Sequence, residues 1–559
     1  MTSLTKNRIM KKQLIPVAAL LLLITGCATT DDAESSAGKN FENVSFETLH
    51  KHATDGKANA QGALAMRYLR GIGVEKDEAK AFEWLEKAAK QGVPGAMAHI
   101  GNFYAKGLGV QQDQAKAFEW LSKAANNGRV DAMAIVGNRY AKGLGVQQDQ
   151  TKAFEWFSKA ANEGRADAMA LVGNRYAEGL GVQQDKAKAF EWMEKSAKLG
   201  HAEAIREIGR YYAFGVGVKT DQAKAFEWLS KASEKGDAEA MTFLSTFYAQ
   251  GVTVEKDEAK AFEWVEKAAN MDNTSAMVKL ASYYVDGVGV ERSPVRTVQW
   301  IRKAANMGDT TAMNQLGRFY TTGGGGLEKS DLVARQWFRK SAENGARNGM
   351  FNLAKMNQDG IGGEKNLKEA AKWMTQAAEL DHVEAQHQLG HLYENGTGVE
   401  KDITKAIEWW LKAAEKGETS SQAHMANRYN SGEGLAKDEA KALYWTKKAA
   451  EGGHPFMQQV LGINYLDGKG LDQDIDKGVA WLKKAAVRGR TDAQYQMGNV
   501  HATDHYGVKN LEQAYFWFSL AKDKNVKAKN ALSHISVEIK PDEMLRALEM
   551  VSEFKEKNK

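Results

Sequence analysis

Tryptophan recurs along this chain at a nearly constant interval. Thirteen of the 14 tryptophans lie 36 residues apart, with one step of 37, and Trp410 is outside the series. The series is Trp84, Trp120, Trp156, Trp192, Trp228, Trp264, Trp300, Trp337, Trp373, Trp409, Trp445, Trp481 and Trp517. A fixed period of this size is typical of stacked units that bury their apolar surface against each other. A repeat array therefore explains the 559 residues better than one core, since single cores stop growing near ~300 residues.

Residues 95–128 illustrate one unit. The segments GAMAHIGNFYAK and QAKAFEWLSKAANN both carry apolar residues at helical spacing, so each unit is predicted to hold a first and a second helix. Asp113 precedes the second helix as an N-cap, and Gly128 follows it as a C-terminal glycine. The same capping residue is expected at Asp77, Asp149, Asp185, Asp221, Asp257, Asp402 and Asp438.

The loop GLGVQQD occurs unchanged at 107–113, 143–149 and 179–185. A dinucleotide site would need a third glycine and a preceding strand, and here the preceding segment is helical. The glycine-rich stretch GGGGLEKS at 323–330 has Glu328 where a phosphate-binding loop needs glycine. We therefore expect no nucleotide, and we interpret the first loop glycine as a helix end and the second as a turn residue with positive φ.

The repeat pattern predicts an all-α chain. We expect thirteen helix pairs over residues 57–525, an N-terminal capping helix within 41–56 and C-terminal capping helices over 526–559. Small residues recur where two helices must approach closely, while tryptophan and tyrosine are expected to fill the gaps between pairs.

The unit A-x-x-x-(L/I/V)-G-x-x-Y-x-x-G-x-G-V-x-x-D-x-x-K-A-x-x-W-x-x-K-A-A-x-x-G resembles the Sel1-like repeat, a relative of the tetratricopeptide repeat. The resemblance implies a right-handed α/α superhelical solenoid that works as an adaptor or scaffold, often in the bacterial cell envelope. Some cysteine-rich relatives are credited with β-lactam binding or hydrolysis, but this chain has a single cysteine. Asn357 and His501 replace the repeat tyrosine in two units, and unit eight carries an extra glycine.

The first 26 residues have the features of a secretory signal. They carry four basic residues and no acidic one, followed by the apolar run LIPVAALLLLI. The tetrad ITGC that ends at Cys27 resembles the bacterial lipobox, which implies that Cys27 becomes the lipidated first residue of the mature chain. A plain signal peptide or a short membrane anchor is the alternative, and either Met1 or Met10 is the start.

Residues 27–40 are small and polar, as expected of a flexible tether. The next residue after the cysteine, Ala28, is not the aspartate that retains lipoproteins in the inner membrane of well-studied Gram-negative systems, so the outer membrane is favoured. The net charge falls from +5 to +1 once the four basic residues of the signal are removed. This near-neutral balance gives no electrostatic reason to expect nucleic acid.

Catalytic signatures are missing from the sequence. G-x-S-x-G does not occur, and the two S-x-x-K matches lie in the tether and the last helix without the accompanying S-D-N or K-T-G. We therefore expect a protein that is not an enzyme and that has no cofactor. A cell-wall or β-lactam hydrolase remains a distant alternative.

The residue after the first-helix glycine is polar in nearly every unit. In tetratricopeptide modules the equivalent residue faces a concave groove, where asparagine can bond a peptide backbone. The alanines one turn earlier (Ala98, Ala134 and Ala170) should leave room for such a ligand. The candidate peptide-binding residues are Asn102, Asn138, Asn174, Arg210 and Arg318, with Lys106 and Lys142 one turn later. A hydrated surface without a specific ligand is the alternative.

Two further patterns have a structural explanation. Glutamate and lysine flank most early tryptophans at i,i+4, as in Glu119 and Lys123, each pair worth ~0.2–0.5 kcal/mol. A lysine row that binds an anionic polymer is the alternative.

His387 and His391 share a helix face, but no third ligand converges on them in the sequence. We expect a satisfied surface pair and no metal.

The sequence thus predicts a lipid-anchored scaffold of the cell envelope. Its partners would be envelope proteins or peptides, bound on the concave face of the solenoid, with the chain facing the periplasm from the outer membrane. An outward-facing protein that binds host or extracellular proteins is the alternative.

Overall fold

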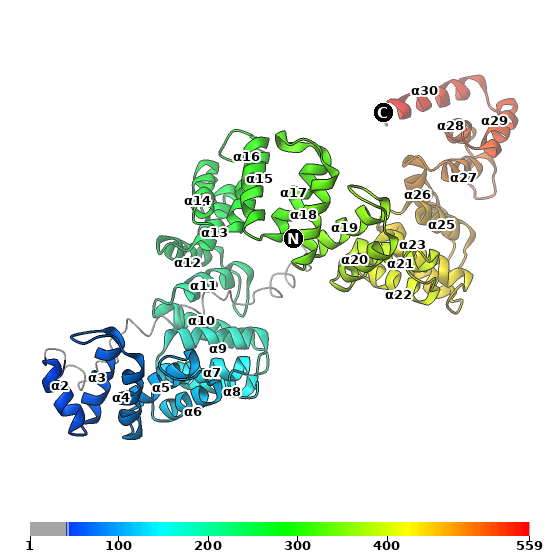
Figure 1. Cartoon of the computed structure of the whole chain (residues 1–559). Coiled ribbons are helices and arrows are strands. Elements are labelled where there is room, and N and C mark those ends of the chain that lie inside the picture. Colours follow the sequence, from blue (N-terminus) through cyan, green and yellow to red (C-terminus); the bar gives the residue numbers. More distant parts are fainter. Residues whose placement is uncertain (1–40, 42–43, 558–559) are drawn as a thin grey trace. The chain divides into compact units, whose positions relative to one another are not determined.

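The computed structural model describes residues 41 and 44–557 (Figure 1). Within these residues the regular elements are the α-helices α2–α30 and one 3-10 helix, η2, with no strand. This confirms the predicted all-α fold. The chain divides into two compact units, Met1–Arg292 and Ser293–Lys559. Cys27, the signal and the tether lie outside the described residues.

The first unit begins with the short helix α2 and continues with alternating first and second helices. The bounds are α2 (Phe46–Thr54), α3 (Ala58–Arg70), α4 (Glu78–Lys90), α5 (Pro94–Lys106), α6 (Gln114–Asn126), α7 (Val130–Lys142), α8 (Gln150–Asn162), α9 (Ala166–Glu178), α10 (Lys186–Lys198), α11 (Ala202–Phe214), α12 (Gln222–Glu234), α13 (Ala238–Gln250), α14 (Glu258–Asn270) and α15 (Thr274–Asp286).

The second unit has the same alternation and ends in two additional helices. The bounds are α16 (Pro294–Asn306), α17 (Thr310–Thr322), η2 (Gly324–Gly326), α18 (Asp331–Glu343), α19 (Arg347–Asp359), α20 (Leu367–Glu379), α21 (Val383–Asn395), α22 (Ile403–Glu415), α23 (Thr419–Ser431), α24 (Glu439–Glu451), α25 (Pro455–Asp467), α26 (Ile475–Val487), α27 (Thr491–Ala502), α28 (Leu511–Ala521), α29 (Val526–Glu538) and α30 (Pro541–Lys557).

Each second helix begins at a polar cap. The carboxylate of Asp113 accepts a hydrogen bond from the Lys116 amide at 2.9 Å, which satisfies one of the free donors of the first turn. Equivalent bonds to Asp149 and Asp185 measure 2.9 and 3.0 Å. Because the cap recurs in successive repeats, their loops lead into the second helix with the same capping geometry.

The glycine-rich loop is a packing element. Gly107 ends α5 in the left-handed conformation with φ of 73°. In the next repeat Gly145 has φ of 74°, and a Cβ built on it would lie 1.9 Å from the backbone oxygen of Gln114, at the start of α6. The second loop glycine therefore permits one repeat to rest its backbone on the preceding repeat.

Aromatic rings join successive repeats in the first unit. The ring of Phe118 on α6 meets Tyr140 on α7 edge to face, with centroids 5.1 Å apart. The equivalent pairs Phe82–Tyr104 and Phe154–Tyr176 are separated by 5.4 and 5.2 Å. Such pairs are worth about 0.5–1.5 kcal/mol beyond their buried area. The repeat tyrosine thus packs against the second helix of the repeat before it.

Most of the periodic tryptophans are only half-buried; Trp445 and Trp517 are buried. Trp120 carries the Lys123 ammonium 4.5 Å above its ring, and Lys123 also pairs with Glu119 at 2.6 Å. The fully buried position is the next one, occupied by Leu121, Phe157 and, in the following repeat, Met193. The prediction that tryptophan fills the gaps between helix pairs therefore needs correction for the early repeats, where the residue after tryptophan fills the core and tryptophan packs at its edge; it holds for the buried Trp445 and Trp517.

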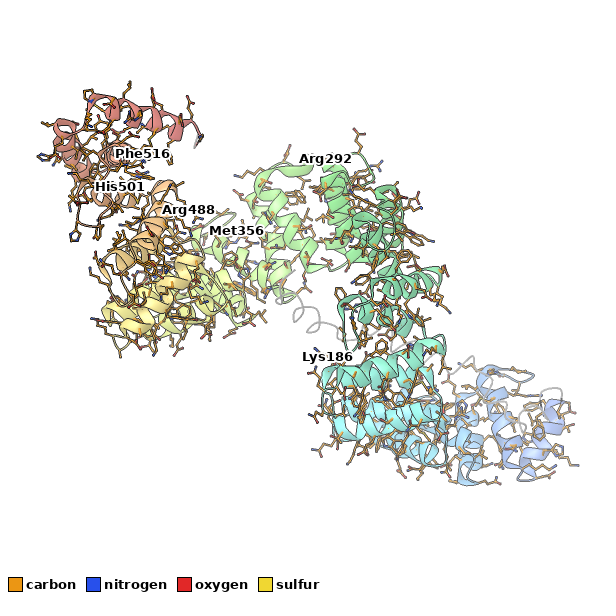
Figure 2. All side chains as sticks on the ribbon, turned by 180° about the vertical axis from the view of Figure 1, so that it is seen from behind. Lys186, Arg292, Met356, Arg488, His501 and Phe516 are labelled. Carbon is orange, nitrogen blue, oxygen red and sulfur yellow. The ribbon has the colours of Figure 1, made fainter. Side chains whose placement is uncertain are left out.

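The irregular repeats keep the fold by local substitutions. The extra glycine of the eighth repeat is absorbed by η2, where Gly325 packs against Val298 of α16. Asn357 is buried at a tyrosine position and accepts a hydrogen bond from Arg335. At another tyrosine position, the Nδ1 atom of His501 lies 3.0 Å from the Val508 carbonyl oxygen; His501 is labelled in Figure 2.

Helices of membrane-spanning length and hydropathy do not occur among residues 41 and 44–557.

We predict that Gly145→Ala destabilises the array more than Gly128→Ala. Alanine at either position costs about 1 kcal/mol for the left-handed backbone. At Gly145 the added methyl group also overlaps the backbone at the start of α6, which brings the loss to about 3 kcal/mol. Gly128 is the matched control because a Cβ there has no atom within 4 Å. Amide hydrogen exchange of α6 and α7 measures the loss of stability in each variant. Equal losses of protection in the two variants would contradict the packing role of the loop.

We also predict that the capping aspartates make the fold acid-sensitive. Backbone hydrogen bonds, chiefly from the amide three residues on, lower the pKa of four caps below the ordinary value of 3.8: Asp77, Asp257, Asp402 and Asp438. Their stabilisation is complete above the unfolded pKa and is lost as the pH falls through the folded pKa.

Replacement of these four aspartates by asparagine tests whether the caps cause the acid sensitivity of the fold. Asparagine caps helices about as well but does not titrate in this range. The urea midpoint of the parent chain should fall more steeply between about pH 5 and pH 2.5 than that of the variant. Parallel curves would show that other groups cause the acid sensitivity.

Candidate binding surface

The three candidate asparagines occupy equivalent places on α5, α7 and α9. The glycine before each packs on the second helix of its own repeat: a Cβ on Gly101 would lie 2.6 Å from Leu121, and one on Gly137 would lie 2.8 Å from Phe157. The next residue is rotated by about 100° around the helix axis. Asn102, Asn138 and Asn174 are accordingly half-buried beside this contact.

The amide groups of these asparagines are available to a ligand. Among the described residues, the side chains of Asn102, Asn138 and Asn174 have no hydrogen-bonding partner. Lys106 and Lys142, one turn later, are exposed and form no ion pair within the same part of the chain. A half-buried amide without a partner has donors and acceptors that favour a backbone or side chain from outside.

The alanines one turn before the asparagines do not form an open space. Ala98, Ala134 and Ala170 are only 6%, 3% and 3% exposed. Any ligand of the asparagines therefore lies over the amides and towards the lysines, and does not enter between the alanines.

Arg210, the fourth candidate in this row, is held in an ion-pair network between α11 and α13. Its guanidinium lies 2.8 Å from Glu207 and 3.9 Å from Glu239. Arg206, one turn earlier, contacts Asp237 at 3.1 Å and Glu239 at 3.5 Å. Burial alone would lower the pKa of Arg206, but Glu239, Asp237 and Glu207 raise it. Arg210 is therefore not a free cation.

The remaining candidate, Arg318, lies on α17 in the second unit. Its side chain is exposed, and no ion pair of Arg318 is found among the described residues. Arg318 is an exposed cation on the first helix of its own repeat.

Polar contacts that the sequence did not reveal link α13 to α15. Lys279 donates a hydrogen bond to the Thr246 hydroxyl, and the hydroxyl groups of Ser245 and Tyr283 lie 2.8 Å apart. Burial lowers the pKa of Lys279 to about 8. Thr246 occupies the row of the asparagines, so this part of the row is committed to contacts between repeats. No sequence motif signals such a pairing because its partners are more than 30 residues apart.

Two buried arginines follow the second and third asparagines. Arg139 and Arg175 donate to the side-chain oxygens of Gln114 and Gln150 at 3.1 and 2.9 Å. Burial lowers the pKa of both guanidinium groups. Arg139 also donates to the Leu144 carbonyl at 3.2 Å. These arginines hold the glycine-rich loop and are not part of the asparagine row.

The model of the Sel1 repeat family matches the chain thirteen times, and the chain belongs to this family. The matched residues are 58–93, 94–128, 130–164, 166–201, 202–237, 238–273, 274–309, 310–345, 348–382, 383–418, 419–454, 456–489 and 491–526. The match confirms the predicted repeat type and number. Sel1 repeat solenoids are typical of protein-interaction scaffolds.

Two solved structures illustrate the similarity. A protective antigen of uropathogenic Escherichia coli that displays an SLR fold is 30% identical, with 85% of this chain and 94% of that chain covered and a TM-score of 0.47. A Sel1 repeat protein from Oxalobacter formigenes is 26% identical over 55% of this chain and 90% of that chain, with a TM-score of 0.44. No curated protein matches the chain.

We predict that Arg206→Ala loosens the contact between α11 and α13. Removal of the guanidinium takes away the cation that Asp237 contacts and leaves Glu207 and Glu239 to Arg210 alone. Loss of one partner from a buried pair costs about 3–5 kcal/mol. Hydrogen exchange in α11 and α13 should accelerate. Lys142→Ala, which removes an exposed cation from a first helix, is the control and should change stability by less than about 0.5 kcal/mol. Unchanged exchange in Arg206→Ala would contradict the structural role of the network.

Proposed function

We propose that this chain is a non-enzymatic scaffold that binds proteins or peptides over the first helices α5, α7 and α9. The observation that carries the proposal is the row of Asn102, Asn138 and Asn174, whose unpartnered amides recur at the same place in three successive repeats. An extended peptide offers a regular series of amide and carbonyl groups that such a row can bond.

The charges around the row favour a neutral to acidic peptide segment. Lys106 and Lys142 are exposed cations next to the first two asparagines. Arg210 adds no free positive charge, because Glu207 and Glu239 neutralise it. The polar row and its lysines therefore supply orientation and hydrogen bonds, and the resulting affinity depends on contacts in several repeats at once.

We predict that the triple change Asn102→Ala, Asn138→Ala and Asn174→Ala weakens capture of the partner. The captured proteins are identified after cross-linking in cells and then bound to the purified chain. Each asparagine should contribute about 0.5–1.5 kcal/mol, so the triple variant should bind about 10–1,000-fold more weakly.

The control is a second triple variant, Asn126→Ala, Asn162→Ala and Asn270→Ala. These exposed asparagines lie at the ends of the second helices α6, α8 and α14. Equal binding by the two variants would refute the asparagine row as the binding surface.

We further propose that the chain is anchored in the bacterial envelope by lipid on Cys27 and faces the periplasm from the outer membrane. The basic first residues, the apolar run and the tetrad that ends at Cys27 support this proposal, and Ala28 supports the outer membrane. The scaffold would then present its row to other envelope proteins.

We predict that Cys27→Ser prevents lipidation. The parent chain should incorporate labelled palmitate, whereas the variant should not. Ser36→Ala, in the same segment, is the control. Palmitate incorporation by the Cys27→Ser chain would disprove the proposed anchor.

A further inference from the structure

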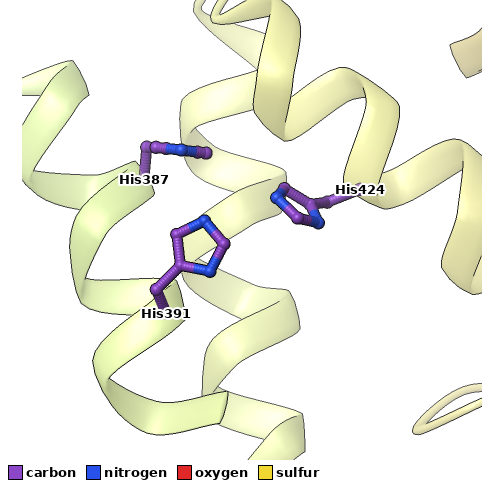
Figure 3. A group of neighbouring side chains, drawn as sticks. All are labelled: His387, His391 and His424. Atoms are coloured by element: carbon purple, nitrogen blue, oxygen red, sulfur yellow. The ribbon is translucent and has the colours of Figure 1, made fainter. Parts of the chain in front are cut away.

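Three histidines from two consecutive repeats converge in the second unit. His387 and His391 lie one turn apart on α21, and His424 reaches them from α23. One nitrogen from each ring can be chosen so that all three lie within 4.8 Å of one another. Figure 3 shows the three rings turned towards a common space between the two helices. The third ligand, which the sequence pair lacked, is thus supplied by the next repeat.

The Nδ1 atoms of the first two histidines are already engaged by acceptors. That of His387 lies 3.2 Å from the Glu418 carboxylate and 2.8 Å from the Ser421 hydroxyl. That of His391 lies 3.2 Å from the Glu394 carboxylate. A carboxylate acceptor keeps the proton on Nδ1 and leaves the Nε2 lone pair free to bind a metal. Carboxylate–histidine pairs of this kind orient the ligands of many zinc sites.

The third histidine is oriented by packing. The His424 ring stacks on the indole of Trp410, with centroids 4.4 Å apart and planes inclined by 8°. Trp410 is fully buried and donates through Nε1 to the His387 carbonyl at 3.2 Å. Gly390 makes room for it, because a Cβ there would lie 2.3 Å from the indole nitrogen. The one tryptophan outside the 36-residue series therefore supports this cluster.

The acidic residues around the cluster are themselves fixed. Glu418 caps α23 by accepting hydrogen bonds from the backbone amides of Ser420 and Ser421. Glu394 accepts a hydrogen bond from Arg428, which also pairs with Glu433 at 2.6 Å. Both carboxylates are held where they contact the histidines, so the ligands are oriented before any ion arrives.

We propose that His387, His391 and His424 bind one Zn²⁺ ion. Three imidazole nitrogens and one open position form a donor set that zinc favours. Zinc–nitrogen bonds of about 2.0–2.1 Å require each nitrogen to move by about 1 Å towards the centre, which small rotations of the rings supply. The histidine side chains at 387 and 391 are 15% and 32% exposed, so water or a partner's side chain can take the fourth position.

The ion would join the first helices of the tenth and eleventh repeats. α21 and α23 carry His387 and His424, so zinc would add a metal link between two repeats that are already joined by packing and by the Arg428–Glu394 ion pair. This proposal is independent of the asparagine row, since all of its residues lie in the second unit.

Zinc titration of the full chain tests the proposal. The protein is purified without a polyhistidine tag, stripped with a chelator and titrated with ZnCl₂ in a calorimeter. We expect one equivalent of tightly bound zinc and a higher melting temperature in its presence. Co²⁺ as a probe should give the intense visible absorption of a four-coordinate ion.

Substitution of the ligands locates the ion. His424→Ala and, separately, His391→Ala should weaken zinc binding at least 100-fold, whereas His534→Ala, which removes an exposed histidine from α29, should leave it unchanged. Circular dichroism of the metal-free variants establishes that each is folded. Because His391 is the more exposed ligand, its variant keeps the test valid if His424→Ala does not fold.

Two outcomes would overturn the proposal. One is that the parent chain binds no zinc. The other is that folded His391→Ala binds zinc as tightly as the parent, which would place the ion elsewhere.

Discussion

The contact between the second loop glycine and the preceding second helix brings the backbones of successive repeats together in much of the array. At Gly145 and Gly181 a Cβ would lie 1.9 Å from the backbone oxygens of Gln114 and Gln150, so no side chain can separate these backbones. The loop reaches this position because another glycine ends the first helix and an aspartate begins the second. Gly217 and Gly289 approach the preceding second helix equally closely, whereas the sixth repeat carries Thr253 at this position with φ of 64°.

This regularity explains why the fold could be predicted from the sequence. Helix ends depend on local residues, and Asp113 and Gly107 are signals that act within a few residues. The 36-residue interval between tryptophans then gives the number of repeats without any knowledge of their packing. The interpretation of tryptophan as a gap filler was wrong for the early repeats, though not for Trp445 and Trp517, because spacing alone does not reveal which of two neighbouring apolar residues faces the core. Leu121 and Phe157 do so, while Trp120 lies at the edge under Lys123.

The candidate sites were less predictable because their residues come from different repeats. The polar row was visible as a pattern, yet the ion pairs that neutralise Arg210 involve Glu239 from the next first helix. The histidine pair on α21 was visible too, whereas His424 is 33 positions from His391 and belongs to no motif. A repeat array brings equivalent positions of successive repeats into contact. A sequence analysed one repeat at a time does not show which of these positions carry residues that can interact with each other.

The near identity of the early repeats has a genetic consequence. Where the loop GLGVQQD recurs unchanged at 107–113, 143–149 and 179–185, recombination between two copies removes or adds 36 residues and preserves both the reading frame and the glycine contact. Each such event shortens or lengthens the asparagine row by one position. Chains that carry different numbers of these copies would therefore differ in the number of asparagines in the row, while the fold of each repeat stays the same.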